Sequence, residues 1–233
     1  MTNTLSNLFL DTVDINYIRK YKWLIRGVTT TPTFFKKSGV DYKTFVENLR
    51  KEFRSIELHI EALAENSEET ENYLKELIKK DWFEPNKVII KIPVTMDNLK
   101  IIFKYSKEGI KFNAHLIFNS SQAYLAASAG ATYVCPLIGR YADEILKDDV
   151  NKLRGGKNDP GKILLTDVID VIKDRFADST KVMASSIRSL SDFENSIKEN
   201  VDFITISPKN LELFIQHEFT AAGIQRFLED MSK

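Results

Sequence analysis

Eight short apolar runs, separated by longer amphipathic or charged stretches, constrain the fold of this chain more than any other feature of its sequence. The runs are rich in β-branched residues and have the length of buried strands. They span residues 7–11, 24–30, 55–62, 87–93, 112–118, 133–138, 181–187 and 203–207. Helical periodicity predicts helices at 14–22, 42–54, 68–81, 96–107, 121–129, 164–175, 191–200 and 209–216. This alternation predicts βα units around a parallel sheet.

Eight such units in 233 residues fit a (β/α)₈ TIM barrel, and we predict that residues 1–217 form one. An open, doubly wound sheet is the alternative, but its first strand is usually followed by a glycine-rich phosphate turn. The segment after the first run, Asp11-Thr12-Val13-Asp14, is not such a turn. The expected fold class is therefore α/β, with a single barrel.

Two segments depart from the simple alternation. Residues 218–233 predict an additional C-terminal helix, whose apolar stripe of Ile224, Phe227, Leu228 and Met231 is expected to pack on the barrel or on a neighbouring subunit. Residues 142–162 form a long connection after the sixth run, and the turn-forming residues from Arg154 onward predict a loop. A loop after the sixth strand would lie at the catalytic face, either as a lid or as a surface insertion.

Composition limits the partners of the chain. Lys plus Arg and Asp plus Glu both number 33, so the formal net charge is zero and nothing favours nucleic acid as a partner. Cys135 is the only cysteine, so no intrachain disulfide forms, which fits a reducing compartment. The first residues lack the basic region of a signal peptide, and no apolar run is long enough to cross a membrane. We therefore expect a soluble, cytoplasmic protein.

Polar residues gather near the ends of seven of the predicted strands, where a barrel builds its active site. They are Asp11, Thr29, Thr30, Thr31, Glu57, Lys91, Asn113, His115, Arg140, Ser185, Ser186 and Arg188. So many polar groups are poorly tolerated in a barrel unless they face one cavity. The pattern therefore predicts a functional site at this end.

Lys91 is the most informative of these residues because it interrupts an apolar strand. Val88, Ile90 and Ile92 share the face that helices must cover, so Lys91 is predicted to point into the barrel. A poorly solvated amine is more readily neutral, and a neutral amine can attack a carbonyl carbon to form a Schiff base. Asp11 or Glu57 would then move protons. The alternative is a structural ion pair between Lys91 and Glu57, or a side chain that reaches out of the barrel mouth.

Several segments, in order along the chain, resemble motifs of the transaldolase family, especially its short branch that includes fructose-6-phosphate aldolase. They are LFLDT (8–12), GVTTTP (27–32), SIE (55–57), VIIKIPVT (88–95), NAHLIF (113–118), GATYV with PLIGR (130–140) and ASSIR (184–188). The likeness runs almost from end to end. Each motif alone is weakly specific, but their order on eight βα units is a strong signal.

The resemblance implies a metal-free, cofactor-free class I mechanism on sugar phosphates of the pentose and hexose phosphate pool. Lys91 would form an imine with a ketose, and Asp11 would take the proton of its C4 hydroxyl. Glu57 would act through a water and His115 in imine formation and release. The substrate would contact Thr29, Thr31, Asn113, Cys135 and Leu137, and its phosphate would be held by Arg140, Ser186 and Arg188. A homo-oligomer is also implied.

Four of these positions depart from the family pattern. Thr31 stands in place of an asparagine, His115 in place of a threonine, and Leu137 in place of an aromatic residue, while Cys135 occupies a position that is often small or hydroxylated. The expected reaction is transfer of a dihydroxyacetone unit between phosphorylated sugars. The departures keep two alternatives open: an aldolase acting on a non-standard donor, and a catalytically silent sugar-phosphate binder. His59 and His217 lack metal-ligand spacing, so no metal site is predicted.

Overall fold

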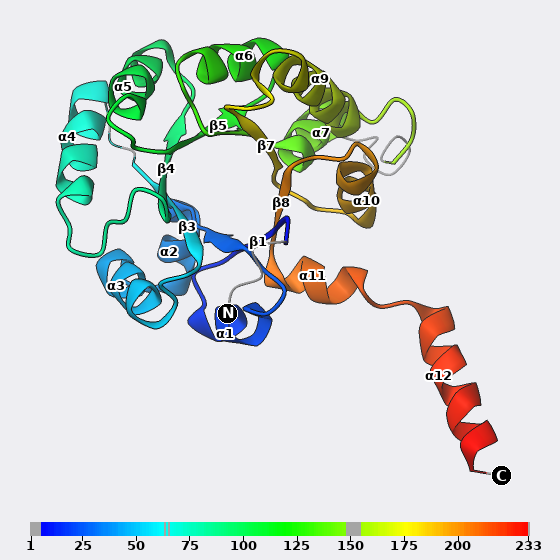
Figure 1. The fold of residues 1–233 in the computed structure, drawn as a ribbon. Coiled ribbons are helices and arrows are strands. Elements are labelled where there is room, and N and C mark those ends of the chain that lie inside the picture. The colour runs from blue at the N-terminus through cyan, green and yellow to red at the C-terminus, as the bar shows by residue number, and fades with distance from the viewer. Residues whose placement is uncertain (1–5, 63, 65, 148–154, 233) are drawn as a thin grey trace.

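The protein folds into a closed barrel of eight parallel strands in the order β1 to β8, as the sequence predicts (Figure 1). The structure is a computed structural model, and it describes residues 6–62, 64, 66–147 and 155–232. The strands are β1 (Leu8–Asp11), β2 (Gly27–Thr29), β3 (Glu57–Glu61), β4 (Val88–Pro93), β5 (Phe112–Ile117), β6 (Tyr133–Pro136), β7 (Lys181–Ala184) and β8 (Phe203–Ile206). Each lies within one of the eight predicted runs.

Helices follow the strands and surround the barrel (Figure 1). They are α1 (Ile15–Tyr21), α2 (Pro32–Ser38), α3 (Tyr42–Glu52), α4 (Ser67–Ile78), α5 (Met96–Ser106), α6 (Ser120–Ser128), α7 (Ile138–Leu146), α9 (Pro160–Phe176), α10 (Leu190–Lys198), α11 (Pro208–Phe214) and α12 (Glu218–Met231). Most begin after a residue whose side chain accepts a hydrogen bond from the first turn, such as Asp41, Thr95 or Asn119. Such caps satisfy N–H groups that the helix itself leaves unpaired.

Two helices, α2 and α7, are absent from the sequence prediction. α7 begins at Ile138, inside the predicted sixth strand, and includes Ala142–Leu146 of the predicted loop. Its start lacks a side-chain cap, and the strand and the helix are both apolar there, so periodicity does not separate them. α9 begins at Pro160, before the predicted loop ends. Arg154 lies outside the described residues, and the proposed lid stays a prediction.

Side chains alternate between two apolar regions along each strand. Val88, Ile90 and Ile92 belong to the large core between barrel and helices, whereas Ile89 packs inside the barrel with Phe9, Tyr133, Cys135, Met183 and Phe203. Lys91 has the parity of Ile89 and therefore faces the barrel interior, as predicted. This interior cluster fills the barrel toward the amino ends of the strands. The carboxyl ends of the strands are left for polar groups.

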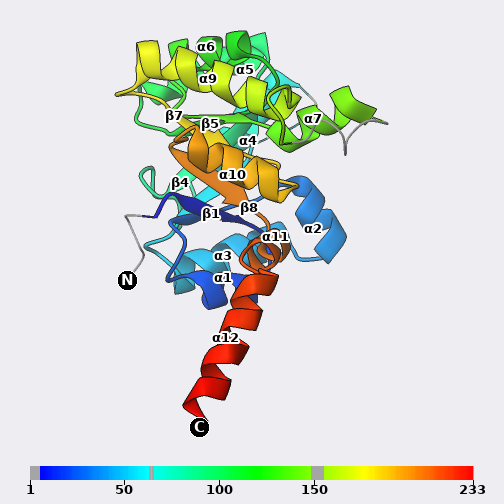
Figure 2. The same cartoon turned by 90° about the vertical axis from the view of Figure 1, so that its right-hand side faces the viewer.

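The C-terminal helix α12 extends away from the barrel in both views (Figures 1 and 2). Its predicted apolar stripe is exposed: Ile224 by 55%, Phe227 by 70%, Leu228 by 56% and Met231 by 84%. Packing of this stripe on a neighbouring subunit stays a prediction. In the part of the chain that the structure describes, no helix combines the length and the apolar character needed to span a membrane.

Candidate active site

A cavity of about 550 Å³ opens at the carboxyl end of the barrel. All the predicted site residues except Glu57 and Asn113 line it: Asp11, Thr29, Thr31, Lys91, His115, Cys135, Leu137, Arg140, Ser186 and Arg188. The sequence analysis did not assign a role to Glu61, Thr205 or Lys37, which also line it. Side chains from far-apart segments meet here because parallel strands all end at the same face of the barrel.

Lys91 lies deep in this cavity, with 5% of its surface exposed. Its ammonium donates a hydrogen bond to the main-chain oxygen of Thr30 at 2.8 Å. Glu61 is the acidic residue paired with it, and Glu61 Oε2 lies 3.7 Å from Lys91 Nζ. The amine therefore has a counter-charge nearby without a direct hydrogen bond to it.

Glu61 also contacts His115 across the barrel interior. His115 Nε2 lies 2.5 Å from Glu61 Oε1, and both residues are more than nine-tenths buried. Burial opposes ionisation of Glu61, but the hydrogen bond from His115 and the charge of Lys91 outweigh it and hold the pKa of Glu61 below its ordinary value. Burial lowers the pKa of His115, and the contact with Glu61 only partly offsets this. The pair is therefore a carboxylate and a neutral imidazole at neutral pH.

The prediction that Glu57 lies beside Lys91 is wrong. Lys91 pairs in register with Glu61, and Glu57 is the first residue of β3, four residues nearer the amino end. That separation is about 13 Å along the strand. Both glutamates face the interior because they share the parity of the strand, so only the register distinguishes them. The alternative of an ion pair between Lys91 and Glu57 fails for the same reason.

Glu57 instead belongs to a buried network at the amino end of the barrel. Its Oε1 accepts hydrogen bonds from Tyr133 Oη at 2.5 Å and from His59 Nε2 at 2.9 Å, and Arg26 Nε lies 3.7 Å from its Oε2. Burial opposes ionisation, but these contacts, led by His59, lower the pKa of Glu57 to about 2. Glu57 is therefore an ionised structural group rather than a group poised to exchange protons.

Asn113 belongs to the same buried network. Its Nδ2 donates to His59 Nδ1 at 2.8 Å, so His59 carries its hydrogen on Nε2 and donates it to Glu57. Asn113 is fully buried and does not line the cavity. Burial lowers the pKa of His59, which keeps this ring neutral.

Asp11 lies on β1, which is separated from β3 by the single strand β2. Thr29 Oγ1 donates to Asp11 Oδ1 at 2.6 Å, and the hydroxyl of Thr205 lies 2.6 Å from the same Thr29 oxygen. Because Thr29 gives its hydrogen to Asp11, Thr205 is the donor in the second bond. Burial raises the pKa of Asp11, with Lys91 and Thr29 acting in the opposite direction. A carboxyl group with a raised pKa suits proton exchange near neutral pH.

Two guanidinium groups stand at the rim, where β6 and β7 end. Arg140 belongs to α7, and Arg188 forms an ion pair with Asp143 of the same helix. Burial and the charge of Arg140 both lower the pKa of Arg188. Ser186, which lines the same cavity, has a φ of 60°, an uncommon conformation for a side-chain-bearing residue that is often found at functional sites. Two nearby cations and a hydroxyl form a suitable site for a phosphate.

Cys135 lines the cavity as a packing residue. Burial raises the pKa of its thiol to about 11, so the reactive thiolate is scarce at neutral pH. In the described part of the chain, no three His, Cys, Asp or Glu side chains come together to hold a metal ion.

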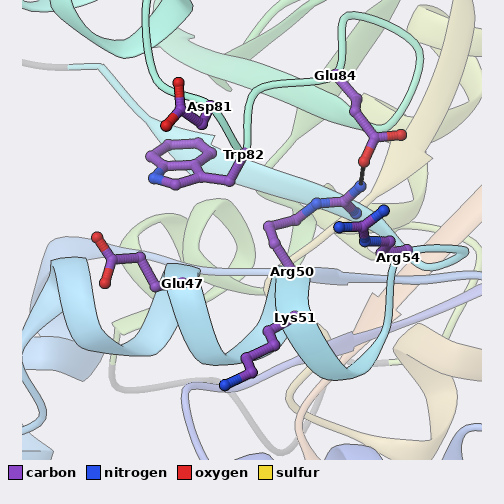
Figure 3. A pocket seen from close by; sticks show the side chains of 7 residues that line it. All are labelled: Glu47, Arg50, Lys51, Arg54, Asp81, Trp82 and Glu84. Atoms are coloured by element: carbon purple, nitrogen blue, oxygen red, sulfur yellow. Dashed lines mark hydrogen bonds and ion pairs between the residues drawn. The ribbon is translucent and has the colours of Figure 1, made fainter.

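A second hollow lies on the outer surface beside α3, at the amino end of the barrel (Figure 3). Its buried member, Arg50, donates to the main-chain oxygen of Ile56 at 3.0 Å and to Glu84 Oε1 at 2.5 Å. These bonds tie the segments that lead into β3 and β4 to α3. The hollow is far from Lys91 and its contacts are structural.

Comparisons with known proteins agree with the fold and with the motifs. A family model described as Transaldolase/Fructose-6-phosphate aldolase matches residues 8–233. A protein named probable transaldolase from Caldicellulosiruptor saccharolyticus is 36% identical over 234 residues, which cover 97% of each chain. Proteins of the same name from Dehalococcoides mccartyi and Methanococcus maripaludis (strain C6) are both 35% identical and cover 96% and 95% of each chain.

Proposed function

Because this chain belongs to the transaldolase/fructose-6-phosphate aldolase family, we propose that it transfers a dihydroxyacetone unit between phosphorylated sugars through a Schiff base on Lys91. The observation that carries the proposal is the position of Lys91. It is a buried amine in a cavity with Asp11 at one side and two guanidinium groups at the rim. The cavity volume, about 550 Å³, suits a small sugar phosphate.

The phosphate of the donor would be held by Arg140, Ser186 and Arg188. Guanidinium groups bind phosphate oxygens through short charge-assisted hydrogen bonds, and an anion would relieve the repulsion between two neighbouring cations. Arg188 would exchange its Asp143 partner for the phosphate. This anchoring would place the ketone carbon of the sugar against Lys91, deeper in the barrel.

Asp11 would then remove the proton of the C4 hydroxyl. The bond between C3 and C4 breaks, its electron pair moves into the iminium group, and an aldehyde leaves. The three-carbon enamine left on Lys91 attacks the carbonyl of an acceptor aldehyde, and Asp11 returns its proton to the new hydroxyl. The raised pKa of Asp11 matches this two-way exchange.

One specific observation favours a second candidate, an aldolase of the same family that acts on a non-standard donor. The four residues that depart from the family pattern all line the same cavity as Lys91: Thr31, His115, Cys135 and Leu137. A lost or added hydrogen bond in a buried site changes substrate preference strongly. The same imine chemistry would then serve a different ketone.

Imine trapping tests both candidates. The protein is incubated with fructose 6-phosphate, reduced with borohydride and weighed intact. An adduct of the whole sugar phosphate shows imine formation, and an adduct of only three carbons shows that the C3–C4 bond was broken. Lys91→Ala should give no adduct, while Lys87→Ala, a change at a half-buried lysine just before the same strand, should behave as wild type.

The choice of donor ketone distinguishes the candidate functions. A three-carbon adduct that an aldose phosphate acceptor removes supports transaldolase activity. Adducts that form with other ketones but not with fructose 6-phosphate or sedoheptulose 7-phosphate support the altered donor. A protein that binds sugar phosphates yet gives no adduct with any of these ketones is a silent binder, and the proposal is then wrong.

A further inference from the structure

Lys37 is a cation of the cavity to which neither the sequence analysis nor the proposed reaction assigns a role. It is exposed on α2, the helix that follows β2, and its side chain lines the same cavity as Lys91. Within the described part of the chain, no hydrogen bond or ion pair joins Lys37 to another side chain. Its charge is therefore not neutralised by a protein partner and is available to a ligand.

The orientation of α2 explains why Lys37 reaches the cavity. Phe34 and Lys37 both line it, and residues three positions apart lie on one face of a helix. Phe35 contacts α3 instead, with its ring centroid 5.2 Å from that of Tyr42 and 5.5 Å from that of Phe45. These contacts hold one side of α2 against its neighbour, so the side that carries Lys37 stays turned toward the cavity.

Lys37 and the two arginines of the proposed phosphate site stand on different sides of the cavity mouth. α2 follows β2, whereas Arg140 belongs to α7 after β6, and Arg188 follows β7. In the closed barrel, β2 is four strands away from β6 and three strands away from β7. α2 and α7 project on the same side of the barrel (Figure 2). A ligand that enters at this face therefore meets cations on both sides of the mouth.

The charges that line the cavity are unequal, although the chain as a whole has no formal net charge. Two carboxylates, Asp11 and Glu61, line it against four cations: Lys37, Lys91, Arg140 and Arg188. Both carboxylates interact with Lys91, deep in the cavity, and Asp143 offsets the charge of Arg188. Lys37 and Arg140 are left to give the mouth a positive charge. A concave site that carries one sign of charge attracts ligands of the opposite sign.

We infer that Lys37 is a third anion-binding residue of the cavity, which contacts the sugar phosphate together with Arg140 and Arg188 and makes the cavity select phosphorylated sugars. The inference deepens the proposed function and rests on its assignment of the phosphate to this rim. The ammonium of a lysine sits on a flexible four-carbon stem and offers three donors, so it can turn toward a phosphate that the arginines hold in a fixed orientation.

Lys36 provides a matched control for this inference. Lys36 and Lys37 both lie in the last turn of α2, where a cation stabilises the helix dipole, and both are exposed. Only Lys37 lines the cavity, because consecutive residues of a helix point about 100° apart. Removing either charge has the same effect on the helix and on the net charge. A difference between the two variants therefore reports contact with the ligand.

The test measures binding of glucitol 6-phosphate by calorimetry to the wild type and to Lys37→Gln, Lys37→Arg and Lys36→Gln proteins. This probe has the chain length and the phosphate of a hexose donor, but it has no carbonyl group and cannot form an imine. We expect Lys37→Gln to weaken binding by about 5-fold, the loss of one charged contact at an exposed site. Lys36→Gln should bind as wild type, and Lys37→Arg, which keeps the charge, should bind within about 2-fold of it.

Two further readouts separate a phosphate contact from a structural role. Raising the ionic strength should weaken binding to the wild type more than binding to Lys37→Gln, because salt screens an exposed charge. In the proposed reaction, the effect of Lys37→Gln on fructose 6-phosphate should fall on the Michaelis constant rather than on kcat, since the phosphate is held equally before and during the chemical step. The Michaelis constant for unphosphorylated dihydroxyacetone should stay the same.

The outcomes distinguish this inference from the proposed function. If the wild type binds glucitol 6-phosphate but forms no adduct with fructose 6-phosphate, sedoheptulose 7-phosphate or dihydroxyacetone, the proposed function is wrong, and weaker binding by Lys37→Gln still supports the inference. If the wild type does not bind the probe, or if Lys37→Gln binds it as tightly as the wild type or as Lys36→Gln, the inference is overturned whatever the trapping shows. An equal rise of the Michaelis constant for dihydroxyacetone and for fructose 6-phosphate also overturns it.

Discussion

Tyr133 donates its hydroxyl to Glu57 across the barrel interior, with 2.5 Å between Tyr133 Oη and Glu57 Oε1. Both residues are less than a tenth exposed, and this bond is one of the contacts that keep a carboxylate ionised below the substrate cavity. This network stabilises the amino end of the barrel and takes no direct part in the chemistry proposed for the cavity. That distinction can be tested by stability measurements.

Stability should depend on pH through Glu57. Its folded-state pKa of about 2 lies below the ordinary value of 4.5, so its contribution is fully present above pH 4.5 and is lost as the pH falls toward 2. We expect Glu57→Gln to lower the free energy of unfolding at neutral pH by about 2 kcal/mol. The gap between wild type and variant should narrow below about pH 4.5. Urea denaturation across this range measures it, and a constant gap would contradict the assignment.

Removing the Tyr133 hydroxyl should be costly because it leaves a buried carboxylate with one donor fewer. We expect Tyr133→Phe to lower the free energy of unfolding by about 1–3 kcal/mol. Tyr105→Phe is the matched control: Tyr105 Oη donates to Glu71 at 2.7 Å, but Glu71 is partly exposed, so water replaces the lost bond. Equal losses in the two variants, measured by urea denaturation, would mean that burial of the carboxylate is unimportant.

Removing one positive charge from the proposed phosphate site should raise the Michaelis constant (KM) for a phosphorylated donor. We expect Arg140→Gln to raise the KM for a phosphorylated donor by about 10- to 100-fold, the loss of a charge-assisted hydrogen bond. The KM for unphosphorylated dihydroxyacetone should not change, because that ligand does not reach the rim. Arg175→Gln, a change on the exposed end of α9, serves as the control. A parallel rise for both ligands would place Arg140 elsewhere in the mechanism.

How far the sequence predicts this structure differs between fold and site. The eight strands follow from apolar runs bounded by caps and turns, and Lys91 is oriented correctly because side-chain parity is a local property of a strand. Glu57 and Glu61 have the same parity, so the choice between them depends on the pairing of β3 with β4, which is not local. The sequence held one unused signal: Glu61 ends its strand, where barrels place active sites.

The sequence does not reveal the hydrogen-bond partners of His115 and Asn113, for a similar reason. His115 binds Glu61, and Asn113 turns to His59 instead of the cavity, although the two residues are two positions apart on β5. Their common parity puts both inside the barrel, but the depth of each layer depends on the tilt of the strands. The depth of a residue in the barrel decides whether its side chain lines the cavity or is buried beneath it. No sequence motif gives this depth.

Cys135 should resist thiol reagents in the folded protein even though it lines the cavity. With its pKa raised to about 11 by burial, the thiolate fraction at mildly alkaline pH is small. We expect native protein to react at least about 100-fold more slowly than urea-unfolded protein with a chromogenic disulfide reagent. Rapid labelling of the native protein would show that the thiol is activated and that its assignment to packing is wrong.

Gly139 sets the distance between α7 and the end of β7, and this distance positions Arg140. A Cβ added at Gly139 would clash with the main-chain oxygen of Ser186, whose backbone cannot yield easily, and would crowd the Arg188 side chain at 3.0 Å. We therefore expect Gly139→Ala to lower the free energy of unfolding by about 1–3 kcal/mol, the usual cost of overpacking. It should also weaken binding of phosphorylated ligands more than that of dihydroxyacetone.

Gly223→Ala is the control, since no atom lies within 4 Å of its added Cβ. Because Gly223 is a helical position, this change should raise the free energy of unfolding by about 0.5–1 kcal/mol. Thermal unfolding and ligand titration of the two variants check both effects, and an unaltered phosphate preference in Gly139→Ala would show that α7 does not set the position of Arg140.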